Sequence, residues 1–220
     1  KSLGARVVKS NAQAVKNADI VLLCNKKDDM GELLSGIGWD LAGRTVIYIA
    51  AGLHSSFVEE RALHAGVVSS MPNLGVKINY SHTGLSAGKS ASEHDRKLAE
   101  GIFSSMGTVE WMDERFRTIF TAACACTPAI AANIMRHLSA SFESLGVERE
   151  DATSWVAKGF AAASLFLNGS EMTAQEIESK VATKGGLTEA GLRKAEALGL
   201  AGMMAEIVET MLSRGKSMEK

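Results

Sequence analysis

The hydrophobic pattern changes period near Asp113, and this change constrains the fold more than any other feature of the sequence. Before that residue, short continuous apolar runs alternate with stretches of helical spacing; the runs lie at residues 17–25, 44–52 and 66–73. Strands that are separated by single helices predict βαβ units and a parallel sheet with both faces covered. Two further strands are expected, at residues 4–8 and 108–112.

After Asp113, apolar residues recur only at helical spacing, and the last long helix is expected over residues 189–212. Pro128 is expected to start or kink a helix. The late helices carry more apolar surface than a monomer of this size easily buries, which favours a helical dimer interface, although a buried core helix would leave the same pattern. We therefore predict an α/β domain over residues 1–112 and an all-α dimerisation domain over residues 113–220.

The composition excludes several classes of function. A formal net charge of -1 leaves no basic surplus for nucleic acid. Three cysteines argue against a disulfide framework, and Cys124 and Cys126 have no further ligands at metal-binding spacing, so they are expected to be small core residues. No apolar run approaches the roughly 18 residues of a membrane span, and the start lacks a signal-peptide core. A soluble, cytoplasmic protein with no membrane partner is expected.

The start of the chain lacks the motif by which parallel α/β domains usually hold a dinucleotide. Such domains begin with a strand, a glycine-rich turn and a helix, and the turn binds the pyrophosphate. This chain begins KSLGARVVKS, without G-x-G-x-x-G. Its opening is typical of a later part of such a domain, so we expect one strand–turn–helix unit of about 30 residues to be missing. The alternative is a sheet domain that never held a nucleotide.

Small or polar residues follow three successive predicted strands. These residues are Asn25 and Lys26 after the first, Ala50, Ala51 and Gly52 after the second, and Met71, Pro72 and Asn73 after the third. Ligands of open α/β sheets collect at the carboxyl ends of the strands, and small residues there let a flat ring pass close to the backbone. The three strand ends together predict a cofactor site, although Pro and Asn are also ordinary turn residues.

The stretch VATKGGLTEAGL, residues 181–192, interrupts two good helical patterns. As a plain connector, Gly185 and Gly186 would end one helix through a left-handed residue, and Thr188 would cap the next. The same atoms also predict a seat for a carboxylate or phosphate, because two glycines and a helix start expose backbone donors. Both interpretations can hold at once.

Four ordered segments of the chain resemble the pyrroline-5-carboxylate reductase family. Residues 10–29, SNAQAVKNADIVLLCNKKDD, are similar to its S-N-x-E-A-V segment, and residues 47–88 to its S-I-A-A-G and M-P-N segments. TIFTAACACTPAI resembles T-A-L-S-G-S-G-P-A-Y, and VATKGGLTEAGL resembles V-x-S-P-G-G-T-T-x-x-G-L. The departures are Lys27 in place of Pro, Leu74-Gly75 in place of Thr-Pro, the run Cys124-Ala125-Cys126-Thr127, and Lys184 in place of Pro.

The resemblance implies a partial Rossmann-type sheet domain, lacking its first strand, turn and helix, followed by an all-α dimerisation domain. It implies hydride transfer from NADPH or NADH to a cyclic imino acid, most directly pyrroline-5-carboxylate, with no metal. It places Asn11 near the adenosine part of the cofactor, although a helix N-cap is an equal interpretation. It places Thr183, Gly185, Gly186 and Thr188 around the substrate, with the Thr188 hydroxyl as proton relay.

The departures keep two alternatives open. The altered Cys124-Ala125-Cys126-Thr127 run and the absent glycine-rich loop favour a non-catalytic or regulatory relative. A related reductase that acts on a different imine or acid fits the same sequence. Because substrate choice depends on side-chain positions, the residue pattern alone does not separate these interpretations.

Overall fold

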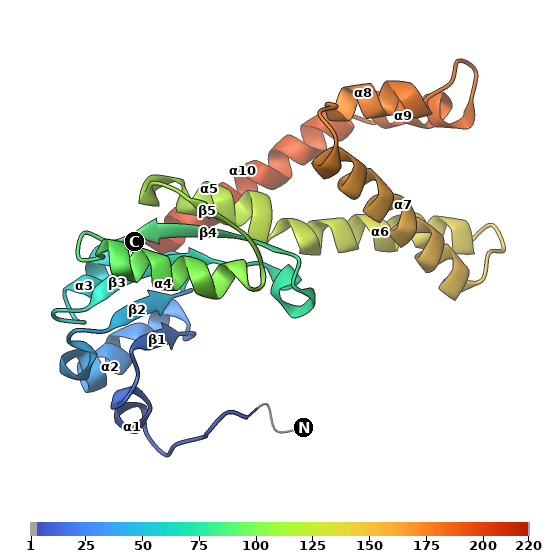
Figure 1. Cartoon of the computed structure of the whole chain (residues 1–220). Helices are drawn as coiled ribbons and strands as arrows, with labels where there is room; N and C mark the ends of the chain where they lie inside the picture. The colour runs from blue at the N-terminus through green and yellow to red at the C-terminus, as the bar shows by residue number, and fades with distance from the viewer. Residues whose placement is uncertain (1–3, 220) are drawn as a thin grey trace. The chain divides into compact units, whose positions relative to one another are not determined.

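The computed structural model describes residues 4–219 and divides the chain into two compact units. The first unit contains residues up to Thr127 together with the last residues from Thr210, and the second runs from Pro128 to Glu209. Figure 1 follows the chain from the sheet into the long helices. The last helix therefore begins in one unit and ends in the other.

The first unit is built on a five-stranded sheet with the order β1-β2-β3-β4-β5. β1, β2 and β3 run parallel, β4 is antiparallel to β3, and β5 is parallel to β4. The first two parallel pairs confirm the expected βαβ arrangement. The strands span Ile20–Leu23, Thr45–Tyr48, Gly66–Met71, Ser81–Ala87 and Gly107–Trp111.

Helices cover both faces of this sheet (Figure 1). One face packs against α2 through Met30 and Leu34 and against α3 through Val58. The opposite face packs against α4 through Ala99 and Phe103. Burial on both faces explains why the central strands read as continuous apolar runs. The helices of this unit are α1 (Asn11–Val15), α2 (Lys27–Ile37), α3 (Ser55–Glu59), α4 (Glu93–Ser104) and α5 (Arg117–Phe120), with short helices η1 (Gly38–Leu41), η2 (Leu74–Ile78), η3 (Glu114–Phe116) and the π-helix η4 (Thr121–Ala125).

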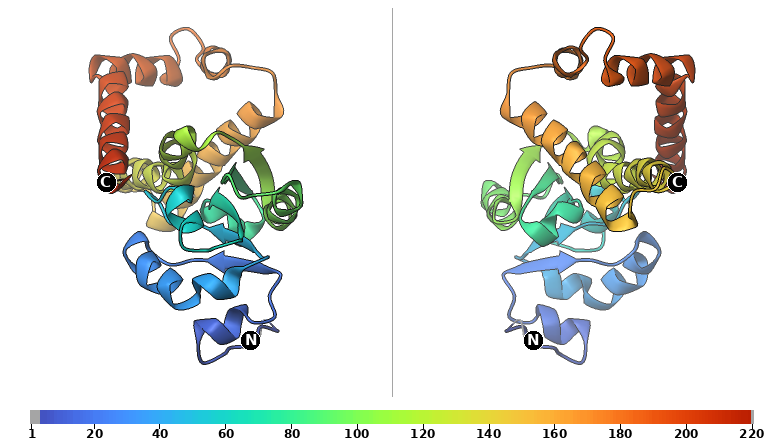
Figure 2. Two further views of the ribbon diagram at one scale, coloured as in Figure 1. Left: turned by 90° about the vertical axis from the view of Figure 1, so that its left-hand side faces the viewer. Right: turned by 90° about the vertical axis from the view of Figure 1, so that its right-hand side faces the viewer.

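The second unit consists of helices joined by short loops and has no strand among residues 128–209 (Figure 2). It comprises most of α6 (Thr127–Glu143), then α7 (Arg149–Gly169), α8 (Ala174–Val181), α9 (Leu187–Ala197) and the first half of α10 (Leu200–Glu219). Pro128 is the second residue of α6, which agrees with the expected helix start. Within residues 128–209 the single chain buries only Ser139, Ala152 and Val156. This unit therefore has almost no core of its own.

Two expectations about elements are wrong, and one strand lies where no element was predicted. Residues 4–8 form no strand. Residues 81–87 form β4, a strand that was not predicted. β4 runs antiparallel to β3 because the connection over residues 72–80 is shorter than the dozen or so residues of a crossover. The single helix expected over residues 189–212 breaks at Leu198, and Gly199 has a left-handed φ of 77°, which ends α9 before α10 begins.

The helical run Glu114–Glu143 also corrects the expectation about apolar length. It contains an 18-residue window of mean hydropathy 1.5, of which 6% is buried in the single chain. By length and composition alone, this run is long and apolar enough to cross a membrane. Core helices of soluble proteins and signal sequences pass the same test, so one such run is weak evidence for a membrane span.

Candidate functional site

The carboxyl ends of β1, β2 and β3 meet at one edge of the sheet because these strands are parallel and in register. Asn25 and Lys26 follow β1 and are exposed, and Lys26 is the N-cap of α2. Thus the residues that the sequence analysis selected at the strand ends do share an edge. Whether they bind a cofactor remains a prediction.

The connection from β2 to α3 is a tight turn with Ala51 and Gly52 at its tip. Gly52 has a φ of 69°, a conformation that glycine adopts without strain. Ala50 is buried and Ala51 is exposed, so the turn presents backbone and one methyl group rather than a large side chain. This geometry suits the close approach of a flat ligand.

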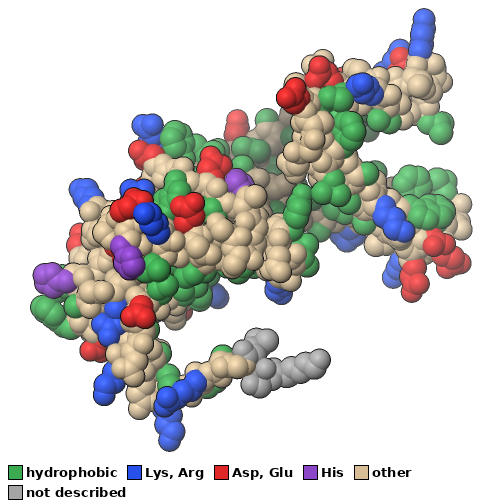
Figure 3. Space-filling model, viewed as in Figure 1, with side chains coloured by type: hydrophobic (Ala, Val, Ile, Leu, Met, Phe, Trp, Pro, Cys, Tyr) green, Lys and Arg blue, Asp and Glu red, His purple; other side chains and the backbone are tan. Residues whose placement is uncertain are grey.

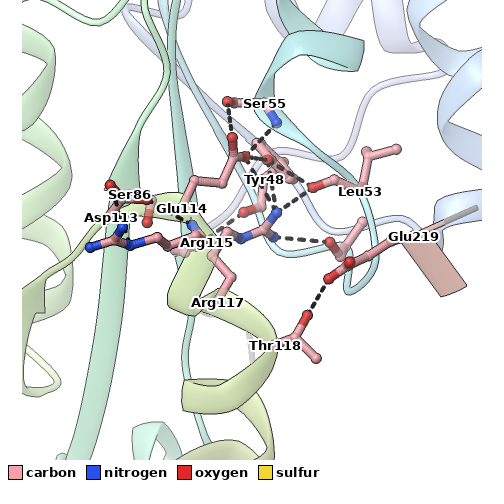
Figure 4. Close-up of polar contacts among 12 residues, drawn as sticks. Tyr48, Leu53, Ser55, Ser86, Asp113, Glu114, Arg115, Arg117, Thr118 and Glu219 are labelled. Atoms are coloured by element: carbon pink, nitrogen blue, oxygen red, sulfur yellow. Dashed lines mark hydrogen bonds and ion pairs between the residues drawn. The ribbon is translucent and has the colours of Figure 1, made fainter. Parts of the chain in front are cut away.

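A buried polar network holds this turn (Figure 4). Arg117, 7% exposed, donates to the carbonyl oxygens of Ala50 at 3.3 Å and Leu53, and to the Tyr48 hydroxyl at 3.2 Å. The Tyr48 hydroxyl donates in turn to the Leu53 carbonyl at 3.0 Å. Burial raises the pKa of Tyr48 far above its usual value, which the neighbouring Arg117 only partly opposes. The phenol therefore stays protonated as a donor.

Glu114 completes the network from the same helical segment as Arg117. Its carboxylate accepts from the backbone N–H of Ser55 at 2.6 Å and from the Ser55 hydroxyl at 2.9 Å. It also lies 3.7 Å from the Arg117 guanidinium. Sequence reasoning missed both charged residues, because they read as parts of an amphipathic helix start. The signal that could have identified Arg117 is a charged residue among the aromatic and aliphatic residues of FRTIF.

The residues at the end of β3 make more contacts within the fold than those that follow β1 and β2. Met71 is buried and is the last strand residue. Asn73 caps η2 by accepting from Gly75 N–H at 2.8 Å, and its amide donates to Cys124 Sγ at 3.3 Å. Pro72 and Asn73 are half-buried. The polar groups of the Asn73 side chain are thus used within the fold.

Asn11 lies at the start of α1, where it is exposed. The N-cap of this helix is Ser10, whose side chain accepts from Gln13 N–H at 3.3 Å. The N-cap interpretation of Asn11 is therefore wrong, because the helix begins one residue earlier than that role requires. Its side chain is left without a capping role.

A cavity of about 410 Å³ lies beside the β2–α3 turn, within the first unit. Ala51 and Gly52 line it together with Arg117, Thr121 and Cys126. The last turns of α10 form another wall through Arg214 and Met218. The cavity thus joins the predicted cofactor edge to the segment in which the chain departs from the Ser-Gly-Ser-Gly pattern.

The end of α10 packs directly on the turn. A Cβ placed at Gly52 would come within 2.7 Å of Met218 Cβ, so no larger residue fits there without movement. The ammonium of Lys27 donates to the Met218 carbonyl. Gly52 is therefore required both by its backbone conformation and by this contact.

Cys124 and Cys126 are half-buried rather than core residues. The Cys124 thiol donates to the His82 carbonyl at 3.4 Å, and burial raises its pKa although the Asn73 amide opposes the shift. This thiol is therefore a poor nucleophile near neutral pH. Within residues 4–219, no group of three His, Cys, Asp or Glu side chains could hold a metal ion.

The Gly-Gly turn of the second unit differs in detail from its expected form. Gly185 is left-handed, with a φ of 75°, but Gly186 is the N-cap of α9 and Thr188 lies inside the helix. The expectation that Thr188 caps the helix is thus wrong, because α9 begins at Leu187. The Thr188 hydroxyl is consequently not engaged as a cap, and its residue is exposed.

The two glycine amides of this turn are occupied inside it. Gly186 N–H donates to the Thr183 carbonyl at 2.8 Å, and Gly185 N–H donates to the Glu189 carboxylate at 2.7 Å. Glu189 is also ion-paired with Arg193 at 2.9 Å. The Glu189 carboxylate thus occupies the Gly185 N–H that was expected to bind a ligand carboxylate, and binding of a substrate at this turn stays a prediction.

Comparison with known proteins identifies relatives over the whole chain. A family described as pyrroline-5-carboxylate reductase dimerisation matches residues 114–218, and one described as NADP oxidoreductase, coenzyme F420-dependent, matches residues 1–52. The pyrroline-5-carboxylate reductase of Thermus thermophilus is 32% identical over 199 residues, which cover 90% of this chain and 75% of the relative. The Vibrio alginolyticus enzyme is 27% identical over 224 residues, covering 100% and 82%.

Solved structures show the same fold. The Plasmodium falciparum pyrroline carboxylate reductase, solved with NADP bound, has a TM-score of 0.93 and 24% identity, covering 100% of this chain and 84% of that one. The Coxiella burnetii pyrroline-5-carboxylate reductase has a TM-score of 0.88 and 24% identity, covering 99% and 82%. These structures, at 24% identity, show the fold alone. The Thermus thermophilus relative is 32% identical over most of both chains, and on that evidence this chain belongs to the pyrroline-5-carboxylate reductase family.

Proposed function

We propose that this protein is an NAD(P)H-dependent reductase of a cyclic imino acid, with pyrroline-5-carboxylate as substrate and proline as product. The single observation that carries the proposal is the 32% identity to the Thermus thermophilus pyrroline-5-carboxylate reductase over 199 residues. The cavity supports it, because small backbone-presenting residues and the divergent helical segment face the same space.

The carboxyl edge of β1, β2 and β3 fits the nicotinamide part of the cofactor. Gly52 is left-handed and packs against Met218, whereas Ala51 is exposed, so the turn leaves room for a flat ring on the side of Ala51. The residues that would hold the cofactor are Asn11, Asn25, Lys26, Ala50, Ala51, Gly52, Met71, Pro72 and Asn73. When bound, the reduced nicotinamide supplies a hydride. The chain orients it and keeps water from the reacting carbon.

The turn of Thr183, Gly185, Gly186 and Thr188 binds the imino acid in this proposal. The Thr188 hydroxyl lies near the ring nitrogen and passes it a proton, while the Gly185 N–H holds the substrate carboxylate. Since the Glu189 carboxylate occupies that N–H in the free chain, binding requires Glu189 to release it. This breaks the charge-assisted hydrogen bond from Gly185 N–H to Glu189, while the ion pair between Glu189 and Arg193 remains.

We also propose that the protein is a cytoplasmic homodimer or higher oligomer built through α6 to α10. Residues 128–209 bury only three residues in the single chain, and hydrophobic side chains lie at the surface along α6 and α7 (Figure 3). Phe142, Leu145 and Trp155 are 43%, 79% and 58% exposed. A second copy that covers this surface provides the core that the second unit lacks.

Steady-state turnover tests the proposed function. The purified full-length protein is expected to oxidise NADPH or NADH when pyrroline-5-carboxylate is added, and to form proline in equal amount. Nucleotide oxidation without added imine is the control. No turnover with either nucleotide across pyrroline-5-carboxylate and a panel of cyclic imino acids would contradict the proposal and favour a non-catalytic relative.

One observation favours a second candidate within the same reaction class. Cys126 lines the cavity in the segment where the family pattern has small Ser and Gly residues. A different side-chain volume at this wall changes the ring size or substituents that fit. Higher kcat/KM for a different cyclic imino acid than for pyrroline-5-carboxylate would establish this second candidate.

A further inference from the structure

Arg117 is a buried cation whose hydrogen bonds converge on a single turn. The side chain enters from the first residue of α5, and its guanidinium reaches the carbonyl oxygens of Ala50 and Leu53. Figure 4 shows Arg117 beside Tyr48 and Leu53, and the guanidinium carbon lies 5.1 Å from the centroid of the Tyr48 ring. Ala50 and Leu53 are the outer residues of the turn, with Ala51 and Gly52 between them. One planar group thus holds both ends of the turn.

Glu114, the counter-ion of Arg117, also binds the first residue of the next helix, α3. Glu114 pairs with Arg117 at 3.7 Å and binds the N–H and hydroxyl of Ser55, the first residue of α3. The segment 50–55 is therefore fixed at three points by two residues of the helical run that begins after β5. These contacts all lie within the first unit.

Stability alone does not explain this arrangement. A buried ion pair gives little net stabilisation compared with apolar residues of the same volume, because both charges lose their hydration. Arg117 Nε is buried with no hydrogen-bond partner among the described residues, which adds to the cost. What a guanidinium provides and an apolar side chain lacks is a fixed fork that spans two carbonyls.

The held turn is also a wall of the cavity. Ala51, Gly52, Leu53 and Arg117 all line the same space of about 410 Å³. We infer that Arg117, with Glu114 as its counter-ion, is a positioning residue that sets the Ala51-Gly52 backbone against the nicotinamide end of the cofactor. The inference rests on the proposed function, and Arg117 acts through the turn rather than on the reacting atoms.

Two substitutions test the inference against a matched control. Arg117→Met keeps the length of the apolar stem and removes the fork, and Arg117→Lys keeps the charge. Arg115→Met, two residues away, removes an arginine whose side chain is 73% exposed. The measurements are amide hydrogen exchange of residues 51–55 in the free protein, KM for NADPH, kcat, and melting temperature, all in the full-length protein.

We expect Arg117→Met to speed exchange at residues 51–55 and to raise KM for NADPH at least tenfold, with a smaller change in kcat. Arg117→Lys is expected to give the same pattern, because an ammonium cannot hold both carbonyls in one geometry. Arg115→Met should match the wild type. If Arg117→Met does not fold, Glu114→Gln, which keeps the shape and removes the counter-ion, should show a weaker change in the same direction.

The outcomes separate the inference from the proposed function. An active wild type whose KM for NADPH is unchanged in Arg117→Met and in Glu114→Gln overturns the inference alone. Wild-type KM for NADPH and wild-type hydrogen exchange in Arg117→Lys would also overturn the inference, since positive charge alone would then be enough to position the turn. A wild type that is inactive on every imino acid overturns the proposed function, and the cofactor part of the inference with it, whatever the exchange data give.

Discussion

At the scale of single residues, Thr188 is the side chain on which the proposed chemistry depends. It is exposed and lies inside α9, with Gly186 rather than Thr188 as the N-cap. Its hydroxyl is therefore free of the structural role that the sequence pattern suggested. That separation makes the catalytic role easier to test, because removal of the hydroxyl no longer removes a cap.

Thr188→Val keeps the side-chain shape and removes the hydroxyl. We expect turnover of the imino acid to fall by about 10²–10⁴-fold, the usual range for lost proton-transfer help. The melting temperature should stay close to that of the wild type, since exposed substitutions usually change stability by less than about 0.5 kcal/mol. Steady-state rates and thermal melts measure both. Rates unchanged in this variant would remove Thr188 from the site.

Glu189→Gln tests the carboxylate seat at Gly185. The Glu189 carboxylate accepts from Gly185 N–H, so a substrate carboxylate must displace it and approach a like charge. Glutamine weakens the hydrogen bond to Gly185 N–H and removes the repulsion between the Glu189 and substrate carboxylates. KM for the imino acid should therefore fall severalfold, with little change in KM for NADPH. Glu178→Gln, in the preceding helix, is the control. A raised KM would instead mean that Glu189 supports the turn.

At the scale of elements, Asp95 fixes α4 to the sheet. It completes a capping box with Ser92 and accepts from the Thr45 hydroxyl of β2, while a Cβ at Gly66 of β3 would lie 2.2 Å from its carboxyl carbon. Burial acts to raise the pKa of Asp95, but the hydrogen bonds from Ser92 and Thr45 outweigh it and hold the pKa below its usual value. The charged form is thus favoured in the folded state.

The pH dependence of stability follows from that direction. Stability from Asp95 is fully present above its unfolded pKa of about 3.9 and is lost as the pH falls through the lower folded value. Asp95→Asn should therefore lower the free energy of unfolding by about 1–3 kcal/mol at pH 7, as for lost hydrogen bonds to a charge. The difference in the free energy of unfolding between Asp95→Asn and the wild type should become smaller in strongly acidic solution, because Asp95 is then protonated in the wild type as well. Urea melts at several pH values measure it, with Glu93→Gln as the exposed control on the same helix.

At the scale of the whole molecule, the two units differ in how they are stabilised. The first has a core on each face of its sheet, whereas residues 128–209 bury three residues in the single chain. The proposed dimer resolves this difference, because the apolar faces of the long helices become an interface.

Light scattering at micromolar concentration should therefore report at least twice the 23.3 kDa of one chain. Leu165→Glu combined with Phe166→Glu places charges on α7, where these side chains are 55% and 51% exposed, and should lower the measured mass and the melting temperature together. Leu74→Glu, at a residue 63% exposed in the first unit, is the control. A monomeric wild type at this concentration would contradict the interface.

The sequence by itself determined the features that depend on local pattern. The period of the apolar residues predicted the α/β half and the helical half, the strand ends predicted a shared edge, and four motifs identified the family. The sequence did not predict β4, because the small residues of this strand show no strand pattern. Its antiparallel direction follows from the short loop before it. Only the tertiary structure brought Arg117 and Glu114 to the Ala51-Gly52 turn, which lies more than 60 residues earlier in the chain. The physical reason is that a residue pattern records which side a side chain faces, whereas a buried hydrogen bond depends on which distant backbone groups the packed elements bring within reach.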